Sequence, residues 1–230
     1  MKLNLIVLSV LFFSIQIFNS ISQETTCKIS LKGFINEAML TKIKNIDCSN
    51  PHVLLSSSGG EERISLLIAQ ELEKLSATIS VDNVCLSACA EVILPAARKV
   101  KLGPKSLIGF HGNPIMRKEL TLIYKPSGYQ NCTFSEAEDM SSLYERQGVK
   151  TDFWKSQLKY LHLTGVSFSN PTTSNCPYGQ FKMKYQMWLP NSQELKKYLG
   201  LNFDGSVCAD HKDCRNKVNK MKIFKSYTFS

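Results

Sequence analysis

After its first 22 residues, the sequence has no apolar run long enough to cross a membrane, no internal repeat and no recognisable nucleic-acid-binding motif. These absences argue against a further membrane-spanning helix, repeat architectures and the common modules that read DNA or RNA. Only four histidines are present, so few side chains are available as a general base near neutral pH.

The first 22 residues have the layout of a secretory signal peptide, with an apolar run from Leu3 to Phe18 followed by small and polar residues. The run is short for a membrane span, so we expect cleavage near Gln23 and an exported, periplasmic or secreted protein. An uncleaved anchor is the alternative, and only that alternative predicts association with a membrane.

The formal net charge is +9, and it falls to +8 when Lys2 leaves with the signal peptide. Lysines and arginines are scattered, with mild clusters at 98–105 and 212–225, and such clusters are usually solvated faces. A basic surface attracts anionic partners in general. Export and the lack of a binding motif argue against a nucleic-acid partner.

Eight cysteines follow the expected cleavage site, and an even number of cysteines in an exported chain indicates disulfides. Proximity in the sequence favours the pairs Cys27–Cys48, Cys85–Cys89, Cys132–Cys176 and Cys208–Cys214. A metal site at Cys208, His211 and Cys214 is the alternative for the last pair, but thiols tend to be oxidised in such a compartment.

The remaining chain of about 208 residues is long enough for one domain with a sizeable core. Its first half alternates between predicted strands and helices, which is typical of an α/β fold with a largely parallel sheet. The predicted elements are strands at 28–35, 53–55 and 78–81, helices at 37–46, 61–76 and 88–97, and a strand or strand pair at 100–110.

The second half has weaker patterns. A capping box, Ser135-x-x-Glu138, predicts a helix to about Gly148, and Thr151 is a candidate cap for a helix at 152–161. We expect the domain to end at residue 205. Within it, we expect an irregular insertion at 162–184 and a short helix at 192–199, and after it a basic, cysteine-bearing tail at 206–230.

Three positions in the first half indicate a hydrolytic site. Gly59 and Gly60 follow one predicted strand, Ser87 lies between a strand and an apolar helix, and His111 ends a later strand. Parallel strands bring such positions to one edge of the sheet. A glycine pair, a serine and a histidine supply an oxyanion hole, a nucleophile and a base, with the Ala88 amide as a second oxyanion donor.

Each of these residues also has an ordinary structural interpretation. A glycine pair is common in a tight strand-to-helix turn, and a serine is a common helix N-cap. A lone histidine is more often structural than catalytic. A Cys85–Cys89 disulfide would restrain the turn that carries Ser87.

The segments Leu54–Gly60, Cys85–Ala90 and Leu107–His111 resemble the core of the Clp-protease/crotonase superfamily, in particular its exported branch with Ser-x-Gly-Gly and Cys-x-Ser-x-Cys-Ala patterns. The resemblance covers residues 27 to 112 well and returns weakly at 188–201. It implies a repeated β-β-α-type spiral, and self-assembly of copies of this chain.

Position by position, the resemblance implies Ser87 as the nucleophile and His111 as the base. Gly59 or Gly60, together with Ala88, would hold the oxyanion. No metal and no organic cofactor is implied, and the implied substrate is a peptide or protein.

The sequence departs from this pattern at two places. Ser58 stands where the family usually has proline, and Gln186 stands near the position of the family's third residue, an aspartate. A glutamine could orient His111 but would not supply a charge to stabilise an imidazolium. The nearest acidic candidates, Asp152 and Asp204, do not match by position.

The leading hypothesis is therefore an exported serine hydrolase with a Ser–His pair, and the resemblance implies a peptidase. The lack of the acidic residue leaves open a binding or assembly protein of the same fold that has lost catalysis. A Ser–Lys arrangement lacks a clearly matching lysine. An acyl-CoA enzyme, the third alternative, conflicts with export.

Overall fold

The computed structural model describes residues 27–125, 133–150, 152–169, 178–200 and 203–221. The expected signal peptide, the predicted pair Cys132–Cys176 and the candidate cap Thr151 lie outside these residues. Within the described ranges, no helix is both long enough and apolar enough to span a bilayer.

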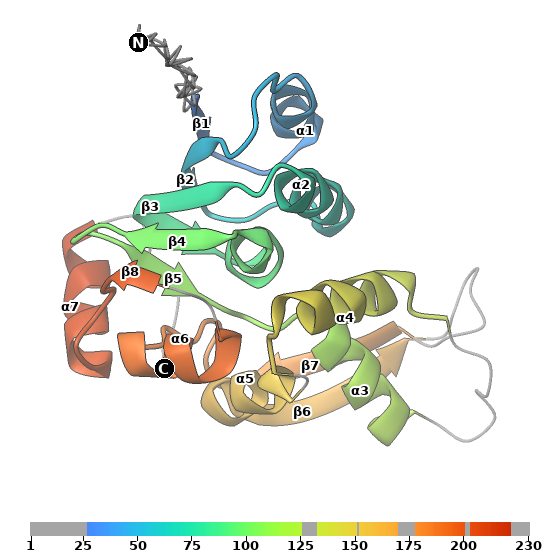
Figure 1. Ribbon diagram of the computed structural model, residues 1–230. Helices are drawn as coiled ribbons and strands as arrows, with labels where there is room; N and C mark the ends of the chain where they lie inside the picture. Colours follow the sequence, from blue (N-terminus) through green and yellow to red (C-terminus); the bar gives the residue numbers. More distant parts are fainter. Residues whose placement is uncertain (1–26, 126–132, 151, 170–177, 201–202, 222–230) are drawn as a thin grey trace, which may run out of the picture.

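A parallel sheet forms the centre of the molecule (Figure 1). Its strands run in the order β1-β2-β3-β4-β8, and β5 pairs with the distal part of β3. The strands are β1 (Lys28–Lys32), β2 (His52–Ser57), β3 (Thr78–Leu86), β4 (Lys99–Leu102), β5 (Leu107–Gly109) and β8 (Phe203–Gly205). The prediction of an α/β fold with a largely parallel sheet is confirmed.

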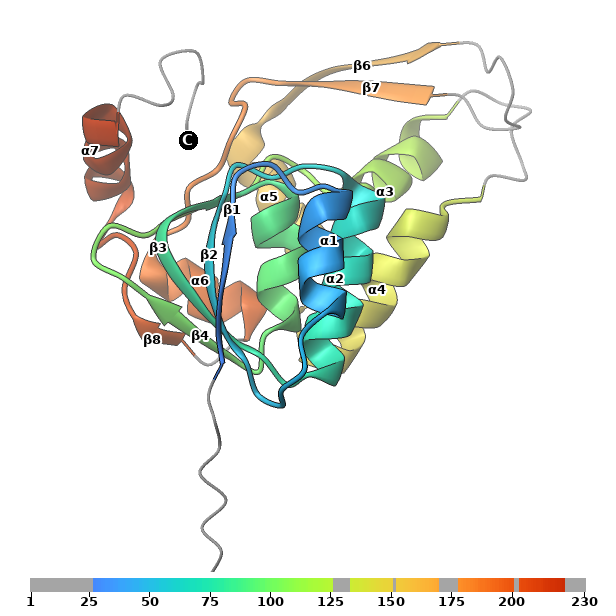
Figure 2. The same cartoon turned by 90° about the horizontal axis from the view of Figure 1, so that it is seen from above.

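Two helices, α1 (Glu37–Lys44) and α2 (Glu62–Lys74), cover one face of this sheet (Figure 2). Helix α2 buries Ile64, Ile68 and Leu72, which lie on one side at helical spacing. Strand β2 alternates between buried and half-buried residues, so one of its faces belongs to the core. Burial of these apolar faces is the main driving force for this layer.

The apolar segment after Ser87 is helical, as predicted, but it is not a regular α-helix. It forms a π-helix, Cys89–Ile93, followed by a short 3₁₀ turn, Leu94–Ala96. Pro95 explains part of this irregularity, because it lacks the N–H that would bond the Glu91 carbonyl in an α-helix. That carbonyl instead accepts a 2.8 Å hydrogen bond from the Tyr144 hydroxyl.

The second half of the chain packs beside the sheet as helices and a two-stranded antiparallel sheet (Figure 1). Helix α4 ends at Gly148 as predicted, whereas Ser135 is its first residue rather than its cap, so the predicted capping box is wrong. The elements are α3 (Pro114–Tyr124), α4 (Ser135–Gln147), α5 (Phe153–Leu161), β6 (Leu163–Ser169), β7 (Tyr178–Met183) and α6 (Ser192–Leu199).

The prediction of an irregular insertion at 162–184 is wrong where the structure describes it, because β6 and β7 pair there. Serine, threonine and glycine dominate the composition, but Val166 lies opposite Phe181 in the pairing. Phe168 and Phe181 also make an edge-to-face contact with centroids 6.4 Å apart. Such cross-strand pairs stabilise a sheet despite polar neighbours.

Strand β8, at the predicted end of the domain, joins the central sheet beside β4. The predicted basic tail, 206–230, is partly helical, because it contains α7 (His211–Met221). Three predicted disulfides are confirmed: Cys27–Cys48, Cys85–Cys89 and Cys208–Cys214, with Cα–Cα distances of 6.6, 5.2 and 5.2 Å. The last pairing excludes the alternative metal site, because both thiols are consumed.

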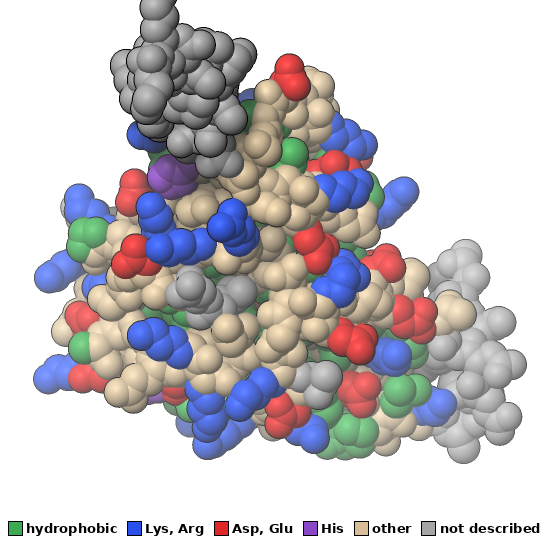
Figure 3. All heavy atoms as spheres, viewed as in Figure 1, with side chains coloured by type: hydrophobic (Ala, Val, Ile, Leu, Met, Phe, Trp, Pro, Cys, Tyr) green, Lys and Arg blue, Asp and Glu red, His purple; other side chains and the backbone are tan. Residues whose placement is uncertain are grey.

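On the face drawn in Figure 3, lysine and arginine side chains are interspersed with aspartate and glutamate. This distribution agrees with solvated charge rather than one continuous basic surface on that face.

Candidate active site

Gly59, Ser87 and His111 lie just beyond the carboxyl ends of β2, β3 and β5. These three strands are parallel, β2 and β5 each pair with β3, and their carboxyl ends meet at one edge of the sheet. The predicted meeting of these segments is therefore seen in the fold.

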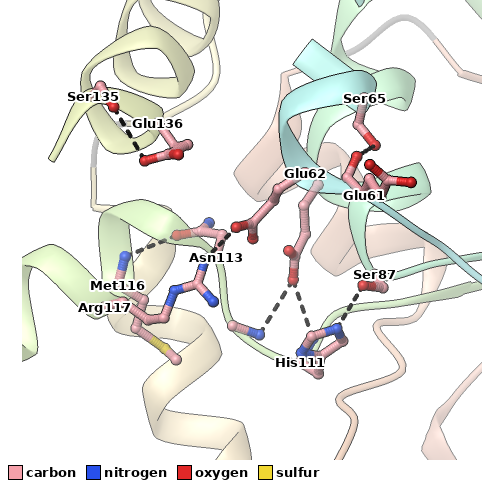
Figure 4. Close-up of polar contacts among 12 residues, drawn as sticks. Glu61, Glu62, Ser65, Ser87, His111, Asn113, Met116, Arg117, Ser135 and Glu136 are labelled. Carbon is pink, nitrogen blue, oxygen red and sulfur yellow. Dashed lines mark hydrogen bonds and ion pairs between the residues drawn. The ribbon is translucent and has the colours of Figure 1, made fainter. Parts of the chain in front are cut away.

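Ser87 has an unusual backbone conformation. Its φ of 55° lies in the left-handed region, which is uncommon for a residue other than glycine. Its N–H donates to the Gly109 carbonyl at 2.9 Å, and its carbonyl accepts from the Glu91 N–H at 2.9 Å. These two bonds fix the turn so that the half-buried side chain points toward His111 (Figure 4).

The Ser87 Oγ and the His111 Nε2 are 2.5 Å apart, which is a short hydrogen bond. His111 remains exposed on one side, but its partial burial against the surrounding chain lowers the pKa of its imidazole, while the negative charge of Glu62 partly opposes this effect. A neutral imidazole can accept the serine proton, so this pair has the geometry and the charge state of a nucleophile with its base.

Gly59 approaches Ser87 more closely than any other residue type would allow. Its φ is 105°, and a Cβ added there would lie 2.5 Å from the Ser87 Cβ and 2.9 Å from its Oγ. The Gly59 N–H donates to the Ser57 hydroxyl at 3.1 Å. The N–H groups of Gly60 and Ala88 have no acceptor among the described residues. These two N–H groups can therefore donate to a bound oxygen atom.

A buried carboxyl that the sequence analysis did not identify lies behind this pair. Glu91 is 1% exposed, and its Oε1 accepts hydrogen bonds from the backbone N–H groups of His111 and Gly112 at 3.1 and 3.2 Å. Burial, with the nearby charge of Glu62, raises the pKa of Glu91 to about 8. The sequence signal was a single carboxyl within the otherwise apolar stretch 88–97.

An aromatic cluster supports the strand that carries His111. Phe110 and Trp188 exchange two backbone hydrogen bonds, of 2.9 and 2.7 Å, and their rings are 5.6 Å apart. The fully buried Trp188 also stacks on Tyr160 with ring centroids 4.6 Å apart. Packing of rings at these distances stabilises the core and fixes the end of β5.

A Ser–His–Asp triad would need a carboxylate bonded to the His111 ring. In the described part of the chain, no carboxylate accepts a hydrogen bond from this ring. Gln186 precedes Trp188 by two residues, so its segment passes beside the one that carries His111. Asp204 pairs with Lys99 at 3.7 Å, and the exposed Asp152 precedes α5.

A second serine–histidine hydrogen bond, 2.6 Å long, joins Ser80 and His52 on β3 and β2. Ser80 lies in mid-strand, paired with Leu54 on one side and Lys101 on the other, so its surroundings offer no free N–H groups for an oxyanion. This pair lacks the loop geometry of the Ser87 site.

The other two histidines have structural partners. His162 ends α5 and makes an edge-to-face contact with Tyr185, and His211 lies 3.3 Å from a Glu194 oxygen. In the described residues, no group of three or more His, Cys, Asp or Glu side chains could hold a metal ion.

The Cys85–Cys89 disulfide encloses Ser87, and both of its residues are fully buried. Replacing both with alanine is expected to lower the free energy of unfolding by about 2 kcal/mol, because the cross-link restricts the unfolded chain. Hydrogen exchange at residues 85–93 should also accelerate locally. Urea unfolding and amide exchange measure the two effects.

The matched control replaces Cys208 and Cys214, whose bridge closes a loop of similar length. It should lose about the same stability, because loop length determines the entropic contribution. Exchange at residues 85–93 should stay at the wild-type rate. Equal acceleration in both double variants would contradict a local role for the first bridge.

No protein-family model and no curated protein matches the chain. Several solved structures are similar to it. A point mutant of ClpP1 from Listeria monocytogenes has a TM-score of 0.44 and 14% identity, over 82% of this chain and 95% of that one.

The ClpP protease catalytic domain from Plasmodium falciparum has a TM-score of 0.42 and 15% identity, over 80% and 87% of the two chains. A mutant of the 1510-N membrane-bound stomatin-specific protease has a TM-score of 0.42 and 15% identity, over 84% and 83%. At these identities and scores, the likeness does not assign a function to this chain.

Proposed function

We propose that the protein is an exported serine hydrolase, with a peptide or protein as its substrate. The observation that carries this proposal is the 2.5 Å hydrogen bond between Ser87 Oγ and His111 Nε2, made by a serine held at a positive φ beyond the end of a parallel strand. A serine that only caps a helix does not require a neutral histidine beside its hydroxyl.

The chemistry is acyl transfer. His111 Nε2 takes the proton of Ser87 as the Oγ forms a bond to the acyl carbon, and the carbonyl oxygen becomes an oxyanion. The N–H groups of Gly60 and Ala88 would stabilise that charge. Protonated His111 then gives its proton to the leaving group as the acyl–leaving-group bond breaks. Water then attacks the acyl carbon and gives a proton to His111, and His111 passes that proton to Ser87 Oγ as the bond between Oγ and the acyl carbon breaks.

Export is supported by the disulfides of the described region. Three cysteine pairs are bridged, and structural disulfides form and persist in oxidising compartments. We also propose cleavage of the signal peptide near Gln23 and a domain at 23–205.

The test is labelling of the oxidised protein, lacking residues 1–22, with a fluorophosphonate probe, read by intact mass and peptide mapping. A single adduct on Ser87 is expected. Ser87→Ala should show none, and His111→Ala should label far more slowly, because the base that activates the hydroxyl is missing. Circular dichroism and thermal melting confirm that both variants fold.

A binding or assembly protein without catalysis is the second candidate. It is favoured by one observation, the lack of a described carboxylate bonded to the His111 ring. Absence of an adduct on folded, fully oxidised protein would overturn the hydrolase proposal and leave this one.

A further inference from the structure

Glu91 connects the two residues of the proposed catalytic pair. It lies in the π-helix four residues after Ser87, and it is the one acidic or basic side chain in the described residues that is fully buried. A buried carboxyl is unfavourable unless its hydrogen bonds are worth more than the water it loses. Its partners therefore indicate its role.

Three polar groups of Glu91 are engaged at once. Its N–H donates to the Ser87 carbonyl at 2.9 Å, and its Oε1 accepts from the His111 and Gly112 N–H groups. Its own carbonyl accepts from the Tyr144 hydroxyl of α4 at 2.8 Å. One residue thus holds the backbone of the serine, the backbone of the histidine and a helix from the second half of the chain.

We propose that Glu91 is a positioning residue that fixes the distance between Ser87 Oγ and His111 Nε2 by binding the backbone of both residues. This inference rests on the proposed hydrolase function of that pair. Glu91 touches neither the reacting hydroxyl nor the imidazole ring in any observed hydrogen bond, so it acts through the main chain.

The role requires an acceptor oxygen, not a negative charge. Both N–H groups donate to the same oxygen, Oε1, so a carboxyl protonated on its other oxygen keeps both bonds. The charged groups near Glu91 are Glu62 from α2 and Arg117 from α3, which are paired with each other. Glutamine has the same shape and the same carbonyl oxygen, and it should replace Glu91 in this role.

Three variants of the oxidised chain without residues 1–22 separate the acceptor from the rest of the side chain. Glu91→Gln keeps the acceptor, Glu91→Asp withdraws it by one methylene, and Glu91→Met removes it with little change of length. Two readouts are measured on each variant: the rate of fluorophosphonate labelling at Ser87, and the ¹⁵N chemical shifts of the His111 ring across a pH titration.

Glu91→Gln should label within about twofold of wild type and keep the His111 signals. Glu91→Met should label roughly 10- to 100-fold more slowly, because a displacement near 1 Å at a reacting pair has an effect of this size. Its His111 signals should also shift. Glu91→Asp should fall between them, and it carries the test if Glu91→Met does not fold.

The control is Glu73→Met, which removes a glutamate of α2 that is bonded to Arg146 of α4. It should leave both readouts at wild-type values. Wild-type labelling with Glu91→Met, or equally slow labelling with Glu91→Gln, would overturn the positioning role.

Failure of the proposed function has a different result. Wild type would then show no adduct, while the His111 titration still tests Glu91. Unchanged His111 signals in Glu91→Met and Glu91→Asp would overturn the positioning of the histidine whether or not the protein is an enzyme.

Discussion

Replacing Gly59 with alanine is expected to slow fluorophosphonate labelling of Ser87 by at least about 100-fold. The new Cβ would lie 2.5 Å from the Ser87 Cβ and 2.9 Å from its Oγ, distances that side chains do not tolerate. The neighbouring Leu86 carbonyl, 3.0 Å from the same position, prevents escape on that side. The serine turn must therefore move, and its hydroxyl must leave His111.

Gly33→Ala is the matched control. Gly33 has a φ of 98°, close to the 105° of Gly59, but no atom lies within 4 Å of an added Cβ. Both variants should lose roughly 1–3 kcal/mol of stability, since alanine is strained at such angles. Only Gly59→Ala should lose labelling. Similar labelling rates in the two variants would show that the approach of Gly59 to Ser87 is unimportant.

The contribution of Glu91 to the stability of the protein should fall as the pH rises from about 4.5 to 8, and Glu91→Gln should remove this contribution. In the unfolded chain Glu91 loses its proton near the ordinary pKa of 4.5, whereas burial raises the pKa of Glu91 to about 8 in the folded protein. Between these values the folded state holds a proton that the unfolded state has released. Raising the pH therefore favours unfolding, by about 1.4 kcal/mol per pH unit for this group.

Urea unfolding of wild type and Glu91→Gln from pH 5 to pH 9 measures this effect. The two proteins should be about equally stable near pH 5, and the variant should be more stable by a few kcal/mol above pH 8. A difference that stays constant across this range would contradict the raised pKa.

Glu73→Gln is a control with the opposite sign. The hydrogen bond from Arg146 lowers the pKa of Glu73, so its stabilising effect is present at neutral pH and is lost as the pH falls through that lowered value. This variant should be less stable than wild type at neutral pH and should approach it in acid.

Hydrophobic periodicity predicted the first half of the fold well, because α2 buries one face and the strands beside it carry runs of apolar residues. The same reasoning predicted that Ser87 and His111 lie at one edge of the sheet, since both follow parallel strands. Periodicity failed at β6 and β7, where only a few aromatic and β-branched residues face one another across the pair. Periodicity also did not predict that Pro95 interrupts the regular helix expected at 88–97.

The sequence analysis did not predict the partners of Glu91, for a different physical reason. Its partners are backbone N–H groups 20 and 21 residues away, and a main-chain donor leaves no trace in residue identity. The sequence also did not predict that the Gly59 N–H donates to the Ser57 hydroxyl, because only the folded turn brings these two groups close.

The disulfide around Ser87 must form before the core of the protein closes during folding. Cys85 and Cys89 are each fully buried, so an oxidising enzyme cannot reach their sulfurs once the core has closed. Under the proposed export, the bridge forms while the segment is still open, early in folding and after the chain has left the reducing cytosol. A copy that folded before export would close its core over two thiols, without the bridge that encloses its nucleophile. Delivery to the oxidising compartment would then act as the maturation step of the site.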